Sequence, residues 1–300
     1  MKKLIIITGL TASGKSGLGI DIAKEYNGEI ISCDSVQVYR GLDIGSAKES
    51  VENRQIVSHH LIDIVEPTYN YNVGEFLKDC KLAVEDCVKR NKLPIIVGGT
   101  GLYVKALLEG YTLGAESNAE FRETWQQFAD KHGKEAVWEE LNKLDTELAA
   151  GVHFNNLNRV IRYLELKIFG EPKKEKPIFS DYEILAVGID APKGEIYPKI
   201  NARVDEMIKM GLEDEVKGLI ALGLNLTHSS MNTIGYREMY QYLTGQIDYE
   251  KCIELIKQHT RNYAKRQLTF MKTIKGLRVV NKEEAKEKIK KFLEEGKNDN

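Results

Sequence analysis

The octapeptide Gly9-Leu-Thr-Ala-Ser-Gly-Lys-Ser16 constrains the fold of this chain more than any other feature. It fits the pattern G-x-x-x-x-G-K-[S/T] at every fixed position. An apolar run, Leu4–Thr8, precedes it, and a helical stretch, Gly17–Tyr26, follows it. A strand, this loop and a helix in that order turn successive backbone N–H groups and the positive end of the helix toward one anion. We therefore predict a phosphate site.

Each fixed position of the loop has a chemical reason. Gly9 and Gly14 allow the tight backbone geometry, Lys15 adds a positive charge, and the Ser16 hydroxyl can bind Mg²⁺. The loop alone leaves open whether the anion belongs to ATP or to another diphosphate. The residues predicted to bind it are Gly9, Leu10, Thr11, Ala12, Ser13, Gly14, Lys15 and Ser16.

Further apolar runs predict the rest of the sheet. Such runs suit strands that are buried on both faces, and helical stretches such as Val73–Arg90 separate them. This alternation predicts an α/β fold of the P-loop type, with a doubly wound parallel sheet. The further predicted strands are Glu29–Ile31, Leu61–Val65, Pro94–Val97, Ile184–Ile189 and Leu277–Val280.

The middle of the chain has a different character. Residues 118–169 have helical periodicity and no clear strand, and a polar stretch with two prolines, Gly170–Pro177, follows them. We predict a helical insertion domain at residues 116–180. The core would then comprise residues 1–115 and 181–300. After Pro198 the chain is mostly helical up to about Lys275, and Lys282–Glu295 is a charged helix.

Composition narrows the class of protein. Of the 300 residues 42% are hydrophobic and 29% charged, with a net charge of −2, so any nucleic-acid contact must use local basic patches. The four cysteines form no C-x-x-C pair, which argues against a zinc site or a disulfide framework. No signal peptide or membrane span is evident. We expect a cytoplasmic protein that does not contact a membrane.

Two further segments lie where ligands bind in open α/β sheets, just after predicted strands. Asp34 and Ser35 follow one strand, and a carboxylate there can take a proton from a substrate or hold Mg²⁺ through water. Asp34 can equally cap a turn or a helix. Gly98-Gly-Thr-Gly-Leu-Tyr103 follows another strand, and its glycines allow either a close approach to a ligand or a plain tight turn.

Taken together, these segments resemble the bacterial tRNA dimethylallyltransferase (tRNA isopentenyltransferase) family. The resemblance runs from about Lys3 to Lys272 in the family's order, with minor departures at Leu10 and Ser16, where most members have proline and threonine. It is carried by the phosphate loop, Asp34-Ser-Val-Gln-Val-Tyr-Arg-Gly-Leu-Asp-Ile-Gly-Ser-Ala-Lys48, His59-His-Leu-Ile-Asp-Ile64, Gly98–Tyr103, Asn158-Arg-Val-Ile-Arg162, Arg203 to Glu215, Ile234-Gly-Tyr-Arg-Glu238 and Ala264-Lys-Arg-Gln-Leu-Thr269.

The resemblance implies a reaction. A dimethylallyl group would pass from its diphosphate to N6 of the adenosine 3′-adjacent to the anticodon, with Mg²⁺ at Ser16. By this resemblance Asp34 is the base, Thr11 lies beside the reacting centre, and Arg203 grips the diphosphate. Members are by default monomers, and we expect no obligate protein partner.

The resemblance also implies contacts with the tRNA anticodon stem-loop. An independent sign is the segment Leu255–Val280, which contains seven Lys or Arg and no Asp or Glu, and in which Lys257, Arg261 and Lys265 share one helix face. The residues implied to bind tRNA are Asp34, Ser35, Val36, Gln37, Thr100, Arg122, Asn158, Arg159, Arg162, Gly235, Tyr236, Arg237, Lys265, Arg266 and Gln267.

Three alternatives stay open. An adenylate-type isopentenyltransferase that acts on free nucleotides would share the loop and Asp34 but would need no RNA surface. An ATP-dependent small-molecule kinase would explain the loop but not the segment Asp34–Lys48. A nucleotide-binding RNA chaperone would have no use for Asp34 as a base.

Overall fold

The computed structural model describes residues 2–110, 118–170 and 176–295. They fall into two compact units, Met1–Glu109 with Pro177–Asn300 and Gly110–Lys176. The boundary expected at residue 116 and most of the polar stretch after Gly170 lie outside the described residues. Residue 180, expected to end the insertion, belongs to the first unit.

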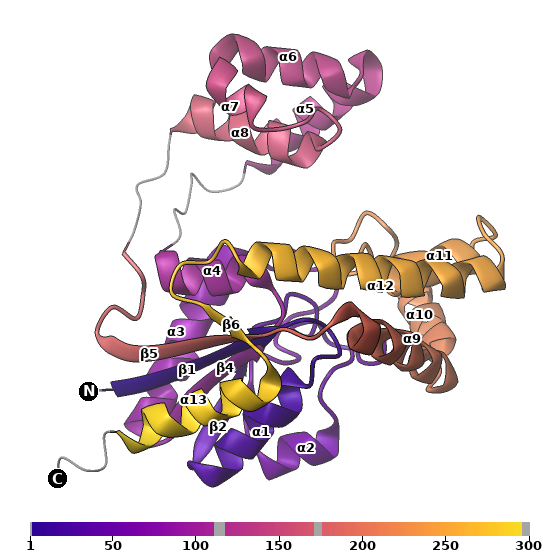
Figure 1. The fold of residues 1–300 in the computed structure, drawn as a ribbon. Coiled ribbons are helices and arrows are strands. Elements are labelled where there is room, and N and C mark those ends of the chain that lie inside the picture. Colours follow the sequence, from indigo (N-terminus) through magenta and orange to yellow (C-terminus); the bar gives the residue numbers. More distant parts are fainter. Residues whose placement is uncertain (1, 111–117, 171–175, 296–300) are drawn as a thin grey trace. The chain divides into compact units, whose positions relative to one another are not determined.

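The first unit is built on a sheet of six parallel strands in the order β3-β2-β4-β1-β5-β6 (Figure 1). The central strand β1 lies between two neighbours, so that Ile6 pairs with Ile96 on one side and Ala186 on the other. The predicted α/β fold with a parallel sheet is confirmed. The strands are β1 (Lys2–Gly9), β2 (Gly28–Ser32), β3 (His59–His60), β4 (Leu93–Gly98), β5 (Tyr182–Ile189) and β6 (Arg278–Val280).

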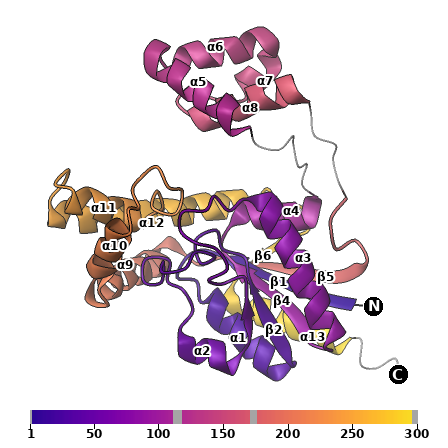
Figure 2. The ribbon, with the colours of Figure 1, turned by 180° about the vertical axis from the view of Figure 1, so that it is seen from behind.

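Helices cover both faces of this sheet, which explains why the middle parts of β1, β4 and β5 are apolar. One face packs against α1 (Lys15–Glu25) and α13 (Lys282–Glu294), whose buried residues join those of the strands in one core. The other face packs against α3 (Val73–Lys89), α4 (Gly101–Glu109) and α12 (Tyr249–Met271), as Figure 2 shows.

A second helical group lies beyond the carboxyl ends of the strands (Figure 1). It consists of α9 (Lys193–Lys209), α10 (Leu212–Ala221), α11 (Tyr236–Leu243) and part of α12, while α2 (Val51–Ile56) is a separate short helix. Its core also takes in apolar residues from the loop after β2, among them Val38, Tyr39 and Leu42. This loop is therefore held between the sheet and the helices, where ligands of α/β folds bind.

The strand predicted at Leu61–Val65 is wrong. Strand β3 covers only His59–His60, and φ is +61° at Leu61 and +57° at Asp63, a left-handed conformation that interrupts any strand. The Asp63 carboxylate instead forms ion pairs with Lys48 at 2.5 Å and Arg54 at 2.8 Å. The segment is a loop that is held against the loop after β2.

The second unit contains α5 (Ala119–His132), α6 (Lys134–Leu144), α7 (Thr146–Ala150) and α8 (Leu157–Phe169). Its described residues form helices and no strand. The unit has its own apolar core, with Val137, Leu141, Val160 and Leu164 fully buried. Among the described residues of the whole chain, no helix is both long and apolar enough to cross a membrane.

Candidate active site

The phosphate loop connects β1 to α1 at the carboxyl edge of the sheet. Its turn depends on left-handed backbone at Ala12, with φ of 60°, and at Gly14, with φ of 80°. The Leu10 side chain is buried between residues of α9 and α12, so only its backbone can face an anion. The Leu10 carbonyl accepts a hydrogen bond of 3.3 Å from Nζ of Lys15, which holds that side chain over the loop.

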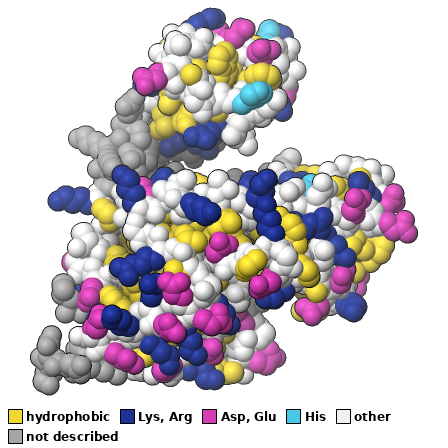
Figure 3. All heavy atoms as spheres, viewed as in Figure 1, with side chains coloured by type: hydrophobic (Ala, Val, Ile, Leu, Met, Phe, Trp, Pro, Cys, Tyr) yellow, Lys and Arg dark blue, Asp and Glu magenta, His cyan; other side chains and the backbone are white. Residues whose placement is uncertain are grey.

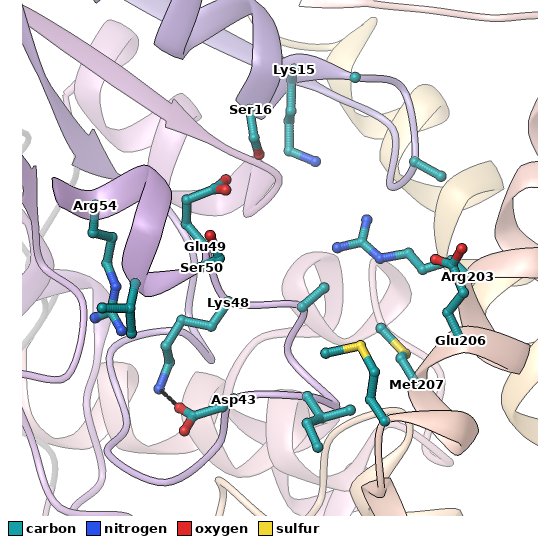
Figure 4. Close-up of a pocket in the computed structure, with 16 residues that line it drawn as sticks. Lys15, Ser16, Asp43, Lys48, Glu49, Ser50, Arg54, Arg203, Glu206 and Met207 are labelled. Carbon is teal, nitrogen blue, oxygen red and sulfur yellow. Dashed lines mark hydrogen bonds and ion pairs between the residues drawn. The ribbon is translucent and has the colours of Figure 1, made fainter. Parts of the chain in front are cut away.

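A cavity of about 600 Å³ lies beside this loop (Figure 4). Figure 4 shows Lys15 and Arg203 pointing into the same space from two different helices. Burial and, to a smaller extent, the charge of Arg203 lower the pKa of Lys15 to about 8, while Asp34 acts in the opposite direction. Burial likewise lowers the pKa of Arg203. Burial and mutual repulsion disfavour the charged forms of these two side chains. A bound anion would offset both effects, so the two cations are suited to receive one.

Oxygen donors in the same cavity have the chemistry that Mg²⁺ requires. Ser16 and Glu49 both line the cavity, and in Figure 4 the Glu49 carboxylate faces the Ser16 hydroxyl. Asn53 donates a hydrogen bond of 2.6 Å to Oε1 of Glu49 and so orients that carboxylate. Mg²⁺ binds carboxylate, hydroxyl and phosphate oxygens, so these residues fit the metal.

Asp34 lies just beyond β2 and caps the turn that follows. Its Oδ1 accepts hydrogen bonds from the backbone N–H groups of Val36 at 2.8 Å and Gln37 at 3.3 Å. Asp34 also lines a second cavity of about 570 Å³, together with Thr11 of the phosphate loop. Capping and proton transfer are compatible here, because the cap uses Oδ1 alone.

Arg203, on α9, joins the two cavities. It lines both of them, as do Ala47 and Met207. In the described part of the chain its guanidinium has no hydrogen-bond or ion-pair partner, although Asp34 and Glu49 act on it through space. A guanidinium can bind two oxygens of one anion. The phosphate loop and Asp34 therefore lie on either side of one available arginine.

Two residues implied to bind tRNA use their polar groups inside the protein. Gln267 is 7% exposed, and Thr100 Oγ1 accepts a hydrogen bond of 3.0 Å from the Ser35 backbone N–H. Neither residue lines the cavity of the phosphate loop or that of Asp34. Gly98 allows the close approach of these loops, since a Cβ there would lie 2.0 Å from the Cys33 carbonyl oxygen.

Other residues implied to bind tRNA divide into two groups. Ser35, Val36, Gly235, Arg237 and Arg266 line the second cavity. By contrast, Tyr236 is buried and donates a hydrogen bond of 2.6 Å to Glu215, and the Gln37 amide donates to the Ala47 carbonyl at 3.2 Å. Lys265 is exposed on α12. Their contacts with RNA stay predictions.

Four more residues of that set lie in the second unit. Arg122 and Arg162 both form ion pairs with the buried Glu165 carboxylate, at 2.7 Å and 2.5 Å. Arg159 donates a hydrogen bond of 2.8 Å to the Tyr163 hydroxyl. The fourth, Asn158, is exposed.

The predicted basic face of α12 is only partly free. Lys257 forms an ion pair of 2.6 Å with Asp205, and Arg261 donates a hydrogen bond of 2.7 Å to Asn201, both on α9. Charges of both signs are intermixed over α13, while Lys and Arg stand along α12 on the face seen in Figure 3. The exposed basic residues toward the end of α12, among them Lys265 and Arg266, are the ones available to RNA.

Three side chains of this region were not predicted from the sequence: Glu49 and His259, which line the cavities, and Lys282. The Lys282 side chain runs past the phosphate loop, where a Cβ placed on Gly14 would lie 3.4 Å from its Nζ. A signal was present, since Lys282 follows the predicted strand Leu277–Val280, and parallel strands end at one edge. Glu49 and His259 had no such signal.

Known proteins resemble the chain over nearly its whole length. Residues 37–274 match the family described as IPP transferase, and residues 2–63 match the family described as Isopentenyl transferase. A tRNA dimethylallyltransferase from Ligilactobacillus salivarius is 42% identical over 306 residues, covering 98% of this chain and 99% of that protein. One from a Thermoanaerobacter species is also 42% identical, covering 97% of each chain.

Solved structures agree. A full-length tRNA isopentenylpyrophosphate transferase from Bacillus halodurans superposes with a TM-score of 0.72 at 37% identity, covering 98% of this chain and 96% of that one. A eukaryotic dimethylallyltransferase acting on tRNA gives a TM-score of 0.77 at 29% identity, covering 94% and 75%. The predicted resemblance is confirmed: the chain belongs to the tRNA dimethylallyltransferase family of prenyltransferases.

Proposed function

We propose that this chain transfers a dimethylallyl group from dimethylallyl diphosphate to N6 of the adenosine on the 3′ side of the anticodon in tRNA. The observation that carries this proposal is that Arg203 lines both the cavity of the phosphate loop and the cavity of Asp34. A diphosphate bound in the first cavity and an adenine bound in the second would meet beside Arg203. A cytoplasmic location, where tRNA is abundant, suits this activity.

The first cavity supplies what departure of the diphosphate needs. As the C–O bond of the donor breaks, negative charge grows on the bridging oxygen. The loop residues that line this cavity are Ala12, Gly14, Lys15 and Ser16, and their backbone N–H groups would face this charge together with the side chains of Lys15 and Arg203. A preorganised donor of this type is worth about 3 kcal/mol in the transition state. Mg²⁺ held by Ser16 and Glu49 would neutralise further charge on the diphosphate.

Asp34 acts as the general base in this proposal. The N6 amine is a poor nucleophile, because its lone pair is delocalised into the purine ring. As the new N–C bond forms and the C–O bond breaks, the amine must lose a proton, and the Asp34 carboxylate can take it. General base catalysis contributes about 10²- to 10⁴-fold in rate. Thr11 lines the same cavity and is proposed to lie beside the reacting centre.

The surroundings of the second cavity suit RNA. Arg237 and Arg266 line it, and Lys265 lies exposed beside Arg266 on α12. The target base must leave its stack to reach Asp34, which costs least for a base in a single-stranded loop. In the second unit, Arg122, Asn158, Arg159 and Arg162 are proposed to add contacts to the anticodon stem-loop.

A labelling assay tests the proposal. The protein is incubated with labelled dimethylallyl diphosphate, Mg²⁺ and either unmodified tRNA or AMP, and the label on each acceptor is measured. We expect label on tRNA, specifically on the adenosine next to the anticodon. Label on AMP alone would contradict a tRNA substrate, and ATP hydrolysis without prenyl transfer would favour a kinase. In Asp34→Asn we expect turnover to fall by at least about 10²-fold. Both substrates should still bind, since the amide keeps the Oδ1 cap to Val36.

A further inference from the structure

The wall of the second cavity contains a buried carboxylate with two basic partners. Glu238, on α11, is fully buried. Its Oε1 lies 2.7 Å from Nδ1 of His259 and accepts a hydrogen bond of 2.6 Å from Arg237. Its Oε2 accepts a hydrogen bond of 2.8 Å from the Gly235 backbone N–H. One buried negative charge therefore holds the N-terminal end of α11 and the His259 side chain of α12 in place.

The state of Glu238 fixes the orientation and tautomer of His259. Burial opposes ionisation, but the hydrogen bonds from His259, from the Gly235 N–H and from Arg237 keep the pKa of Glu238 below its usual value. An ionised carboxylate only accepts hydrogen bonds, so Nδ1 of His259 must carry a hydrogen. Nε2 is then the nitrogen that can change its protonation, and within the described part of the chain no residue bonds it.

Both basic partners face the cavity. His259 and Arg237 line it, and each side chain is 34% exposed. When His259 is neutral, the pair of Arg237 and Glu238 carries no net charge. When His259 is protonated, the same wall carries one positive charge. Asp34, Arg203 and Arg266 are the other charged groups that line the cavity.

We propose that His259, as an imidazolium, binds a backbone phosphate of the RNA next to the target nucleoside, through Nε2–H and beside Arg237. The inference rests on the proposed function, because it assigns a contact to the same cavity. A phosphate suits the site better than a base edge, since charge-assisted hydrogen bonds to phosphates dominate RNA affinity. The group of Arg237, Glu238 and His259 has a net positive charge only when His259 is protonated.

The test is the affinity for an unmodified tRNA anticodon stem-loop, measured by fluorescence anisotropy from about pH 5.5 to about pH 7.5, where histidine titrates. We expect the wild-type protein to bind about three- to tenfold more tightly at the acidic end, which corresponds to one charge-assisted hydrogen bond at a partly exposed site. His259→Asn keeps a donor for Glu238 but carries no charge, so its affinity should stay at the wild-type high-pH level throughout.

Two further variants sharpen the test. His259→Gln places an amide near the position of Nε2 and serves if the asparagine variant does not fold. His228→Asn is the matched control, because His228 is bonded to Asn225 at 3.2 Å and does not line the cavity, so the pH dependence should remain. In acid, His259→Asn should also lower the salt slope of log Kd by about 0.7. A purely structural histidine would change the unfolding temperature and leave this slope unchanged.

Identical pH profiles in the wild type and in both His259 variants would overturn the inference. Failure of the wild type to bind the stem-loop at any pH would instead contradict the proposed function itself. The two failures are therefore distinguishable.

Discussion

The Thr11 backbone N–H donates a hydrogen bond of 2.9 Å to Oε1 of Gln267, which ties the phosphate loop to helix α12. The other end of the same amide donates to the Gly99 carbonyl at 2.9 Å. One buried side chain thus joins the loops after β1 and β4 to the helix whose exposed end is proposed to meet RNA. We infer that the positions of the two cavities depend on this amide.

Removing the amide should weaken both folding and donor binding. Gln267→Ala leaves the Thr11 N–H without a partner, which costs about 1–3 kcal/mol, and leaves the Gly99 carbonyl only the 3.4 Å hydrogen bond from the Tyr263 hydroxyl. We expect a lower free energy of unfolding in urea and a higher Kd for inorganic diphosphate. Gln258→Ala, exposed on the same helix, is the control. Equal behaviour of the two variants would contradict a bracing role for Gln267.

Donor binding should depend on pH through Lys15. Because its pKa is about 8 rather than 10.5, Lys15 carries its charge below about pH 8 and loses it above. Bound diphosphate favours the ammonium and raises that pKa, so binding above about pH 8 must take up a proton, and affinity should fall toward tenfold per pH unit.

Calorimetry of diphosphate binding at about pH 8.5, in buffers of different ionisation enthalpy, measures this proton uptake directly. Lys15→Arg stays charged throughout, so it should show no uptake, even though its affinity is lower. Proton uptake that persists in Lys15→Arg would assign the effect to another group.

Lys282 should add to diphosphate affinity although it lies outside the loop motif. It occupies the first turn of α13, where the positive end of the helix disfavours a lysine, and its Nζ approaches Gly14. An anion in the loop relieves this repulsion. We expect Lys282→Met to raise the Kd of diphosphate about three- to tenfold, with a weaker dependence on salt. Lys286→Met, exposed one turn later, should bind like the wild type, and an unchanged Kd in Lys282→Met would remove this lysine from the site.

Acid should destabilise the sheet through Glu29. Hydrogen bonds from Arg90 at 2.5 Å and 2.6 Å, opposed by burial and aided by His60, lower the pKa of Glu29 from 4.5 to about 2. A carboxyl whose pKa is depressed on folding stabilises the fold above its unfolded pKa, and this stability is lost as pH falls from about 4.5 to about 2.

Glu29, His60 and Cys87 lie close enough together to hold a metal ion, but Arg90 already occupies both carboxylate oxygens of Glu29.

Glu29→Gln should therefore cost about 2 kcal/mol at neutral pH and progressively less toward about pH 2, as followed by thermal unfolding. Glu25→Gln is the matched control, because Glu25 forms an exposed ion pair with Lys290 at 2.7 Å, and it should change stability little at any pH. A difference between Glu29→Gln and the wild type that does not shrink in acid would contradict the assigned ion pair.

Features that depend on neighbours along the chain were predictable. The phosphate loop has a fixed local spacing, and β1, β4 and β5 are apolar runs whose ends lie within two residues of those predicted. Leu61–Val65 has the same apolar character, but Leu61 is buried as part of a loop rather than of a strand. The composition of a short apolar run cannot show whether its leucine is buried in a strand or in a loop.

The assembly of the candidate site depends on contacts between distant parts of the chain. The residues joined by the Thr11–Gln267 hydrogen bond are 256 positions apart. Lys282 meets Gly14, and His259 meets Glu238, only because α13 and α12 pack where they do. Sequence patterns without such contacts located Asp34 and Lys15 but gave no sign that Glu49 lines the same cavity as Lys15.

The central claim is that Arg203 marks the point where donor and acceptor meet. A crystal structure with an unreactive thio analogue of dimethylallyl diphosphate, Mg²⁺ and an anticodon stem-loop tests it most directly. The account predicts diphosphate oxygens on Lys15 and Arg203, and the N6 amine within hydrogen-bonding distance of the Asp34 carboxylate. An adenine bound outside the second cavity, or an N6 amine turned away from Asp34, would contradict it.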